Sequence, residues 1–109
     1  MITSPQADTA RLFAALGDEH RLELVRRLSS GGPRPIVALG EGMAISRQGL
    51  TKHLRTLERA GLVRASRSGR ELHFSIERDR LVEAERFLAL VAAQWGAALE
   101  RLSSHLAAE

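Results

Sequence analysis

Hydrophobic residues in the first 45 positions recur three or four apart between polar or glycine-containing breaks, which predicts three helices. Ser4 is suited to cap a first helix that Gly17 can end in a left-handed conformation, and Asp18 is suited to cap a second. After a loop over residues 29–33, Pro35 is well placed to open a short third helix. The expected hydrophobic faces are Leu12, Phe13 and Leu16, then Leu22, Val25 and Leu28, then Ile36 and Leu39.

The segment 46–60 is the clearest helix in the sequence. Ser46 is a good N-cap, no proline follows before Ala60, and Gly61 can close the helix. Its hydrophobic positions are spaced four and three apart, as one face of a helix requires. These positions are Leu50, Leu54 and Leu57.

Beyond Gly61 the hydrophobic period shortens to about two residues, which is typical of strands. Residues 62–66 and 72–76 are expected to form a β-hairpin around a basic turn at residues 67–70. From Asp79, a good N-cap, a helical pattern continues to about residue 107.

This order of four helices, a hairpin and a final helix predicts a mainly α fold with a small β-hairpin, of the α+β class. The 109 residues fit one domain over 1–109. The short helix, the turn and the capped helix, over about 35–60, form a helix-turn-helix, and the hairpin at about 62–76 makes it a winged helix-turn-helix.

The last helix, 79–107, is too long for a domain of this size to cover, because residues 80–106 alone would span about 40 Å. Its hydrophobic seam therefore needs another partner, and a second copy of the chain is the simplest one. We interpret Trp95 as part of this dimer core, with the lining of a small-molecule pocket as the alternative. The seam contains Leu88, Val91, Trp95, Ala98, Leu102 and Leu106.

The composition excludes several classes of protein. Hydrophobic residues make up 44% and charged residues 27%, as in globular domains and unlike disordered chains. Cysteine is absent, which rules out disulfides and thiolate metal sites in this sequence. No stretch has the ~20 apolar residues of a membrane span, and the first residues do not resemble a signal peptide, so we expect a cytoplasmic protein.

Catalytic signatures are also absent. The sequence has no glycine-rich phosphate loop, no GxSxG motif and no cluster of His, Asp and Glu at metal-ligand spacing. We therefore expect neither enzymatic activity nor a cofactor.

The positive charge is concentrated in one segment. The net charge is +3, but residues 46–80 contain nine Lys and Arg against four Asp and Glu, while residues 1–45 are neutral and residues 81–109 are negative. A local basic surface is either an ordinary solvated face or a binding surface for a polyanion.

The pattern of helix 46–60 favours the second interpretation, a binding surface for a polyanion. With its leucines buried, a rotation of about 100° per residue turns the following side chains outward: Gln48, Thr51, Lys52, Arg55 and Arg59. Gln reads adenine and Thr contacts thymine, while Lys52 and Arg55 suit phosphates or guanine. Arg47 lies nearer the flank, where a phosphate is the expected partner. Cations in this first turn oppose the helix dipole, a cost that a helix entering the major groove accepts. Arg67 and Arg70 of the hairpin are placed to reach phosphates or a minor groove.

Three segments resemble the ArsR/SmtB family of winged-helix repressors. Residues 15–22 (ALGDEHRL) are similar to its opening motif, and residues 45–63 (ISRQGLTKHLRTLERAGLV) resemble its recognition segment. Gly69 and Arg70, followed by Phe74, are similar to its wing. The resemblance covers roughly residues 8–106.

The resemblance implies a homodimeric repressor that binds double-stranded DNA. It carries DNA contacts onto Gln48, Thr51, Lys52, His53 and the wing arginines. It also implies that the first and last helices, the latter over 79–107, form the dimer interface, which we assign to Leu12, Phe13, Leu88, Val91, Trp95, Leu99 and Leu102.

The resemblance leaves the inducing signal open. Metal-sensing members use cysteines on the third helix, where this chain has residues 35–40 without cysteine, or acidic and histidine pairs on the last helix. His105 and Glu109 are four apart, but Glu109 is the last residue of the sequence, where helices fray. The chain resembles the cysteine-free branch, and we expect no metal site.

Two alternatives remain at this point. His53 borders the hydrophobic face of its helix and is either a packed structural residue or a DNA contact. The whole chain is either a DNA-binding regulator or a winged-helix protein-interaction module, with binding to structured RNA as a third reading. The outward face of helix 46–60 has no carboxylate before Glu58, which favours DNA.

Overall fold

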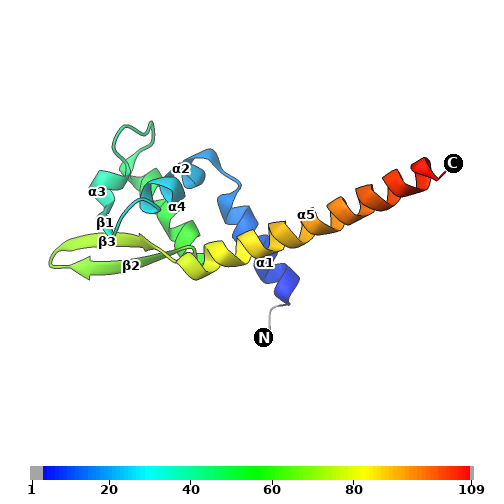
Figure 1. Cartoon of the computed structure of the whole chain (residues 1–109). Helices are drawn as coiled ribbons and strands as arrows, with labels where there is room; N and C mark the ends of the chain where they lie inside the picture. The colour runs from blue at the N-terminus through cyan, green and yellow to red at the C-terminus, as the bar shows by residue number, and fades with distance from the viewer. Residues whose placement is uncertain (1–3, 109) are drawn as a thin grey trace.

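The computed structural model describes residues 4–108 and arranges them as five helices and three short strands (Figure 1). The helices are α1 (Pro5–Leu16), α2 (Glu19–Leu28), α3 (Ile36–Leu39), α4 (Arg47–Arg59) and α5 (Arg78–Ala107). The strands are β1 (Arg34–Pro35), β2 (Val63–Ser68) and β3 (Glu71–Ile76). The predicted mainly α fold, with a hairpin before the last helix, is confirmed. None of the helices in this range combines the length and apolar character that a transmembrane span needs.

The sheet has one strand more than the sequence predicts. β1 pairs with β3 in antiparallel fashion, with Arg34 opposite Phe74 and Pro35 opposite His73, so the strand order is β1-β3-β2. A strand of two residues shows no alternation of hydrophobic and polar positions, and one of these two is a proline. β1 ties the start of the helix-turn-helix to the β2–β3 hairpin, which we call the wing.

Three of the four proposed N-caps are confirmed. The side chains of Ser4, Asp18 and Ser46 each accept a backbone N–H bond from the first turn of α1, α2 and α4. The fourth is wrong, because α5 begins one residue before Asp79 and Glu77, at the cap position, makes no side-chain capping bond. Asp79 instead lies in the first turn, where its charge favours the helix dipole.

The proposed left-handed end of α1 is also wrong. Gly17 follows α1 with a φ of −80°, a conformation open to any residue. A left-handed glycine does follow α4, where Gly61 has a φ of 78° and reverses the chain into β2.

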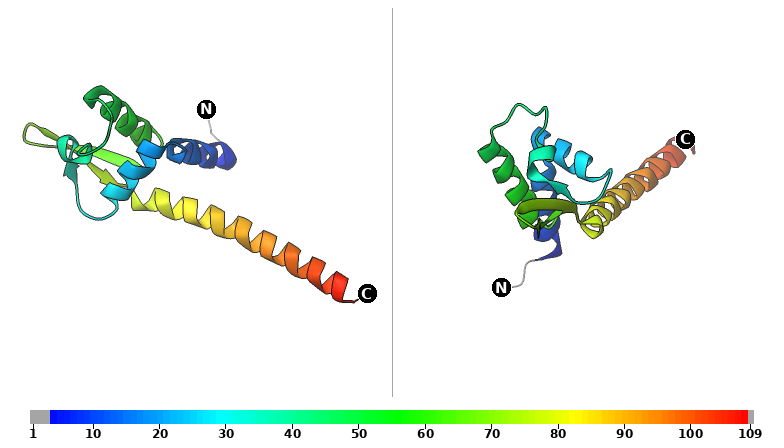
Figure 2. Two further views of the ribbon diagram at one scale, coloured as in Figure 1. Left: turned by 90° about the horizontal axis from the view of Figure 1, so that it is seen from above. Right: turned by 90° about the vertical axis from the view of Figure 1, so that its left-hand side faces the viewer.

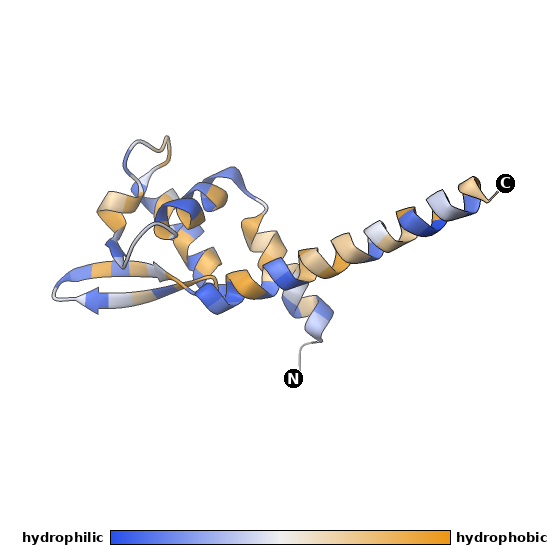
Figure 3. Ribbon diagram, in the orientation of Figure 1, coloured by the Kyte–Doolittle hydropathy of each residue, from blue (hydrophilic) through white to orange (hydrophobic). Residues whose placement is uncertain are grey.

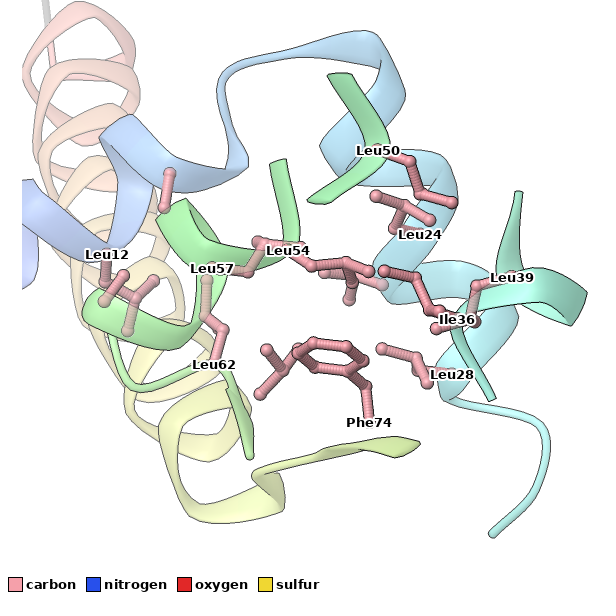
Figure 4. Packing of buried hydrophobic residues seen from close by; sticks show 14 of the residues in the cluster. Leu12, Leu24, Leu28, Ile36, Leu39, Leu50, Leu54, Leu57, Leu62 and Phe74 are labelled. Atoms are coloured by element: carbon pink, nitrogen blue, oxygen red, sulfur yellow. The ribbon is translucent and has the colours of Figure 1, made fainter. Parts of the chain in front are cut away.

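A single hydrophobic cluster holds the helices on the sheet. The ring of Phe74 points from β3 into leucines of α2 and α4 (Figure 4). Gly40 allows α3 to approach α4, since a Cβ there would lie 2.6 Å from Cδ2 of Leu50. The fully buried large side chains are Leu12, Leu24, Leu28, Leu39, Leu54, Leu57, Leu62 and Phe74.

The buried face of α2 differs from the prediction. Leu22 is 53% exposed, and Leu24 is buried together with Val25 and Leu28. A strict spacing of three drifts by about 60° per step around a helix, so Leu22 and Leu28 do not share one face. The pair at 24 and 28 is four apart and does.

α5 leaves the compact body and extends well beyond it (Figures 1 and 2). The described chain measures 69 × 37 × 22 Å, and its long axis is due to this helix. Within α5 only Ala84 is buried. Hydrophobic residues nevertheless continue along α5 to its end (Figure 3).

Candidate nucleic-acid interface

α4 buries one face and presents the opposite face to solvent. Leu50, Leu54 and Leu57 are at most 4% exposed, as the sequence predicts. Gln48 and Lys52 lie on the opposite face, and both are exposed. Because the three leucines fix the rotation of α4 about its axis, they also fix the direction of its polar face.

Two expected contact residues lie on the flank of α4 nearest the wing. Arg47 is exposed in the first turn. Thr51 is half-buried, and its hydroxyl donates a 3.0 Å hydrogen bond to the Arg47 carbonyl. The hydroxyl proton of Thr51 is thus used within α4, which leaves its methyl group and the oxygen lone pairs for a base.

The Arg55 side chain contacts two other side chains of the same protein chain. Its Nη1 lies 2.7 Å from a carboxylate oxygen of Glu58, and its guanidinium lies over the Phe74 ring at 5.9 Å from the centroid. A DNA contact by Arg55 must therefore compete with Glu58. The sequence-based prediction did not include this partner.

The wing is a tight hairpin with a basic tip. Ser68 pairs with Glu71, so only Gly69 and Arg70 form the turn, and Arg67 belongs to β2 rather than to the expected turn. Gly69 has a φ of 65°, which suits a residue without a side chain. Both arginines are exposed.

A groove of about 730 Å³ runs between the start of α4 and the wing. It brings together four of the expected DNA contacts: Arg47, Thr51, Arg67 and Arg70. Glu41 and Glu71 also line this groove and offset part of its charge. Of the other four, the exposed Gln48 and Lys52 project outside it, while Arg55 and His53 are engaged with neighbouring side chains.

His53 faces α2 and takes part in a contact between helices. Its Nδ1 lies 3.2 Å from Nη1 of Arg21, and its ring lies 5.4 Å from that of His20. Arginine only donates, so Nδ1 is the acceptor in this bond and the ring proton is on Nε2. This geometry supports the structural alternative for His53, and a DNA contact through Nε2 stays a prediction.

Arg21 connects three helices through one side chain. Besides His53 of α4, its guanidinium donates to the carbonyl of Ala15 at 2.6 Å and to that of Ala14 at 3.4 Å. Both carbonyls lie at the end of α1, where that of Ala14 also accepts the backbone N–H of Gly17. Arg21 therefore fixes α4 relative to α1.

A histidine and carboxylate cluster surrounds the same contact. Asp18, His20 and His53 place ligand atoms within 4.8 Å of one another. The backbone N–H of Arg21 lowers the pKa of Asp18 below its ordinary value, with smaller effects from the charge of Arg21 and the backbone N–H of His20. The Arg21 guanidinium occupies the lone pair of His53 that a cation would need and repels that cation, so the donor set does not fit a metal. Of the pair His105 and Glu109 considered above, Glu109 lies outside the described residues.

One proposed dimer residue has to be corrected. Leu12 is 1% exposed and lies in the core of its own chain, so it has no surface left for a partner. Phe13 is half-buried, and its ring lies 5.6 Å from that of Phe87 on α5. The helical spacing of α1 alone did not show that Leu12 faces the core and Phe13 faces α5.

The hydrophobic stripe of α5 remains uncovered in the single chain. Val91 is half-buried, and Trp95 is 67% exposed. The other exposed members of the stripe are Leu88, Leu99, Leu102 and Leu106, between 55% and 61%. Positions 88, 95 and 102 are seven apart, the spacing of a seam between two helices.

Arg80 links α5 to the end of α4. Its Nε donates to the carbonyl of Ala60, which follows α4, and its Nη1 lies 2.8 Å from Asp8 of α1 and 2.6 Å from Glu83. The side chain is only 15% exposed. Through this contact the two helices expected at the dimer interface meet the end of α4.

Comparison with known proteins identifies the fold family. A helix-turn-helix domain model matches residues 16–65. A probable mercury resistance operon repressor of Streptomyces lividans is 34% identical over 92 residues, covering 84% of this chain and 73% of that protein. An ArsR-like transcriptional regulator from Rhodococcus sp. RHA1 superimposes with a TM-score of 0.74 at 32% identity, covering 89% of this chain and 91% of that one.

The chain belongs to the ArsR family of transcriptional regulators. It is similar to the homodimeric winged helix-turn-helix DNA-binding domain of a possible ArsR-family regulator from Mycobacterium bovis, with a TM-score of 0.62 and 27% identity over 86% of this chain and 83% of that one. The predicted resemblance is thus confirmed, and α3, α4 and the wing form the DNA-binding part of an ArsR-family fold.

The sequence analysis did not predict the polar contacts between distant segments that position α4. Arg21 and His53 are 32 positions apart, and Arg80 and Asp8 are 72 apart. Hydrophobic periodicity reports which face of one helix is buried and says nothing of such long-range polar pairs. The matched opening motif contains Arg21, but the motif alone does not name its partner.

We predict that Arg21→Lys lowers the free energy of unfolding by about 1–3 kcal/mol, because one ammonium group cannot reach the α1 carbonyls and His53 together. Urea unfolding followed by circular dichroism measures this change. The matched control is Arg26→Lys on the exposed side of α2, where the pair with Glu23 lies in solvent and the change should stay within about 0.5 kcal/mol. Equal losses in the two variants would contradict the role of Arg21.

Proposed function

We propose that this chain is a homodimeric repressor that binds a roughly palindromic operator. Two copies of α4 enter successive major grooves, and the wings contact the flanking backbone. The observation that carries this proposal is the exposed cationic and amide face of α4, next to a groove that both wing arginines help to line. The names of the Streptomyces lividans repressor and the homodimeric Mycobacterium bovis domain support the direction of regulation and the assembly.

In this proposal the whole of residues 1–109 acts as one domain. Residues 35–60 and the wing form the DNA-binding half, while α5 and the Phe13 side of α1 form the dimer contact. The hydrophobic stripe of α5 supports this division, because a second α5 is the partner of matching pattern.

The signal that releases DNA is a separate question. The similar Streptomyces lividans protein is named for mercury resistance. Soft metals favour thiolate ligands, and this sequence contains no cysteine. We therefore do not extend a metal signal to this chain.

Contacts that read bases and contacts that position the protein are expected to respond differently to substitution. Gln48→Ala should cost about 1–3 kcal/mol of binding free energy on the operator and much less on random duplex DNA. Arg70→Ala should weaken binding to both DNAs alike and reduce the salt slope by about one. Fluorescence anisotropy over a salt series measures both effects.

The two variants serve as controls for each other, since both side chains are exposed and neither contributes to the core. Equal losses on both DNAs for Gln48→Ala would remove Gln48 from the base-reading residues. If the unmodified protein binds neither DNA at low salt, the repressor proposal fails in favour of a protein-interaction module.

The dimer is tested at the exposed stripe of α5. Trp95→Glu places a charge in the proposed seam and should give a monomer of unchanged fold, since Trp95 is 67% exposed in the single chain. Light scattering measures the mass, and circular dichroism confirms the helix content. Glu100→Gln on the same helix is the control for altered charge. A Trp95→Glu protein that stays dimeric would place the interface elsewhere.

A further inference from the structure

A second groove lies on the other flank of the recognition helix, away from the wing. It has a volume of about 590 Å³ and is formed where α1, α2 and the last turn of α4 meet. Its lining includes three small side chains, Ala14, Ala15 and Ala60. Each of the three helices adds one arginine: Arg11 from α1, Arg21 from α2 and Arg59 from α4.

The three guanidinium groups of this groove have no carboxylate partner within the described residues. Arg21 bonds to carbonyls and to His53, and Arg59 contacts only the hydroxyl of Thr56, which also lines the groove. The side chain of Arg11 is exposed and takes part in no hydrogen bond or ion pair among residues 4–108. Five other arginines do pair with Asp or Glu: Arg26, Arg27, Arg55, Arg64 and Arg80.

The nearest carboxylate in the contact network is that of Asp18, beyond His53. It lies 3.8 Å from Nδ1 of His53 and accepts the backbone N–H of Arg21, but it makes no bond to the Arg21 guanidinium. Asp18 does not line the groove. The lining therefore carries three positive charges and no negative one.

We propose that this groove binds a small organic anion. A carboxylate or phosphate group would contact the guanidinium groups. The alanines of the lining suit the apolar body of such a molecule, and the volume is that of ordinary small-molecule sites. Carbonyls of α1 and His53 of α4 already hold the Arg21 guanidinium in place. This group therefore does not have to be ordered when the anion binds.

The position of the groove links binding of the anion to the affinity for DNA. Arg59 is seven residues from Lys52, and residues seven apart in a helix lie on nearly the same face. An anion on Arg59 places negative charge beside the surface that faces DNA phosphates and lowers DNA affinity. By linkage, DNA lowers the affinity for the anion by the same factor. This second step rests on the proposed repressor function, while binding of the anion does not.

The binding step is tested without DNA. Isothermal titration calorimetry in a low-salt buffer without phosphate uses benzoate and phenyl phosphate as probes, with benzyl alcohol as the neutral control. We expect saturable binding of at least one anion at millimolar concentration or below, and none of the alcohol. Arg11→Gln and Arg59→Gln should each weaken binding about tenfold, as expected when a charged hydrogen-bond partner is lost.

The control variant is Arg26→Gln, which removes the same charge from the exposed side of α2 and should leave anion binding unchanged. Both test residues are exposed, so their variants are expected to fold, which circular dichroism checks. An absence of saturable binding, or equal binding in all four proteins, would overturn the proposal. If Arg11→Gln and Arg59→Gln weaken DNA binding and no small anion saturates the protein, the groove is a contact for DNA phosphates and the proposal is wrong.

Discussion

The burial of one face of α4 determines most of what this chain presents to its surroundings. Leu50, Leu54 and Leu57 pack with the leucines of α2 and with Phe74 of the sheet, and their burial leaves α4 only one rotation about its axis. Gln48 and Lys52 then point outward because they are on the opposite side of the same helix. The wing follows directly, since Gly61 turns the chain from the end of α4 into β2.

Polar contacts fix what hydrophobic packing leaves adjustable. Arg21 ties the middle of α4 to the end of α1, and Arg80 ties the end of α4 to α1 and α5. α4 is thus joined at two points to the helices that carry the proposed dimer contact. In the proposed dimer, the spacing between the two copies of α4 is therefore set by the same side chains that hold a single chain together.

Local features of the fold were predictable, and relations between distant segments were not. Ser46 caps α4 because a hydroxyl next to free N–H groups acts over a few residues, and the three leucines of α4 follow from a helical period. Leu12 was assigned to the dimer because periodicity gives a hydrophobic face without saying which neighbour covers it. The contact between Arg21 and His53 could not be predicted from the hydrophobic periodicity of the sequence. Of the candidate site, the exposed residues Gln48 and Lys52 were placed correctly on the outward face, whereas Arg55 is held by Glu58 and the Phe74 ring.

The central claim is that two copies of α4 read DNA in successive major grooves. Selection of binding sites by the purified protein from a library of random duplexes tests this claim whatever the operator sequence is. The account predicts an enriched inverted repeat whose half-site centres are about one helical turn apart, roughly 10–10.5 base pairs or slightly more. A library that stays random after repeated selection at low salt, or an enriched site without two-fold symmetry, would contradict it.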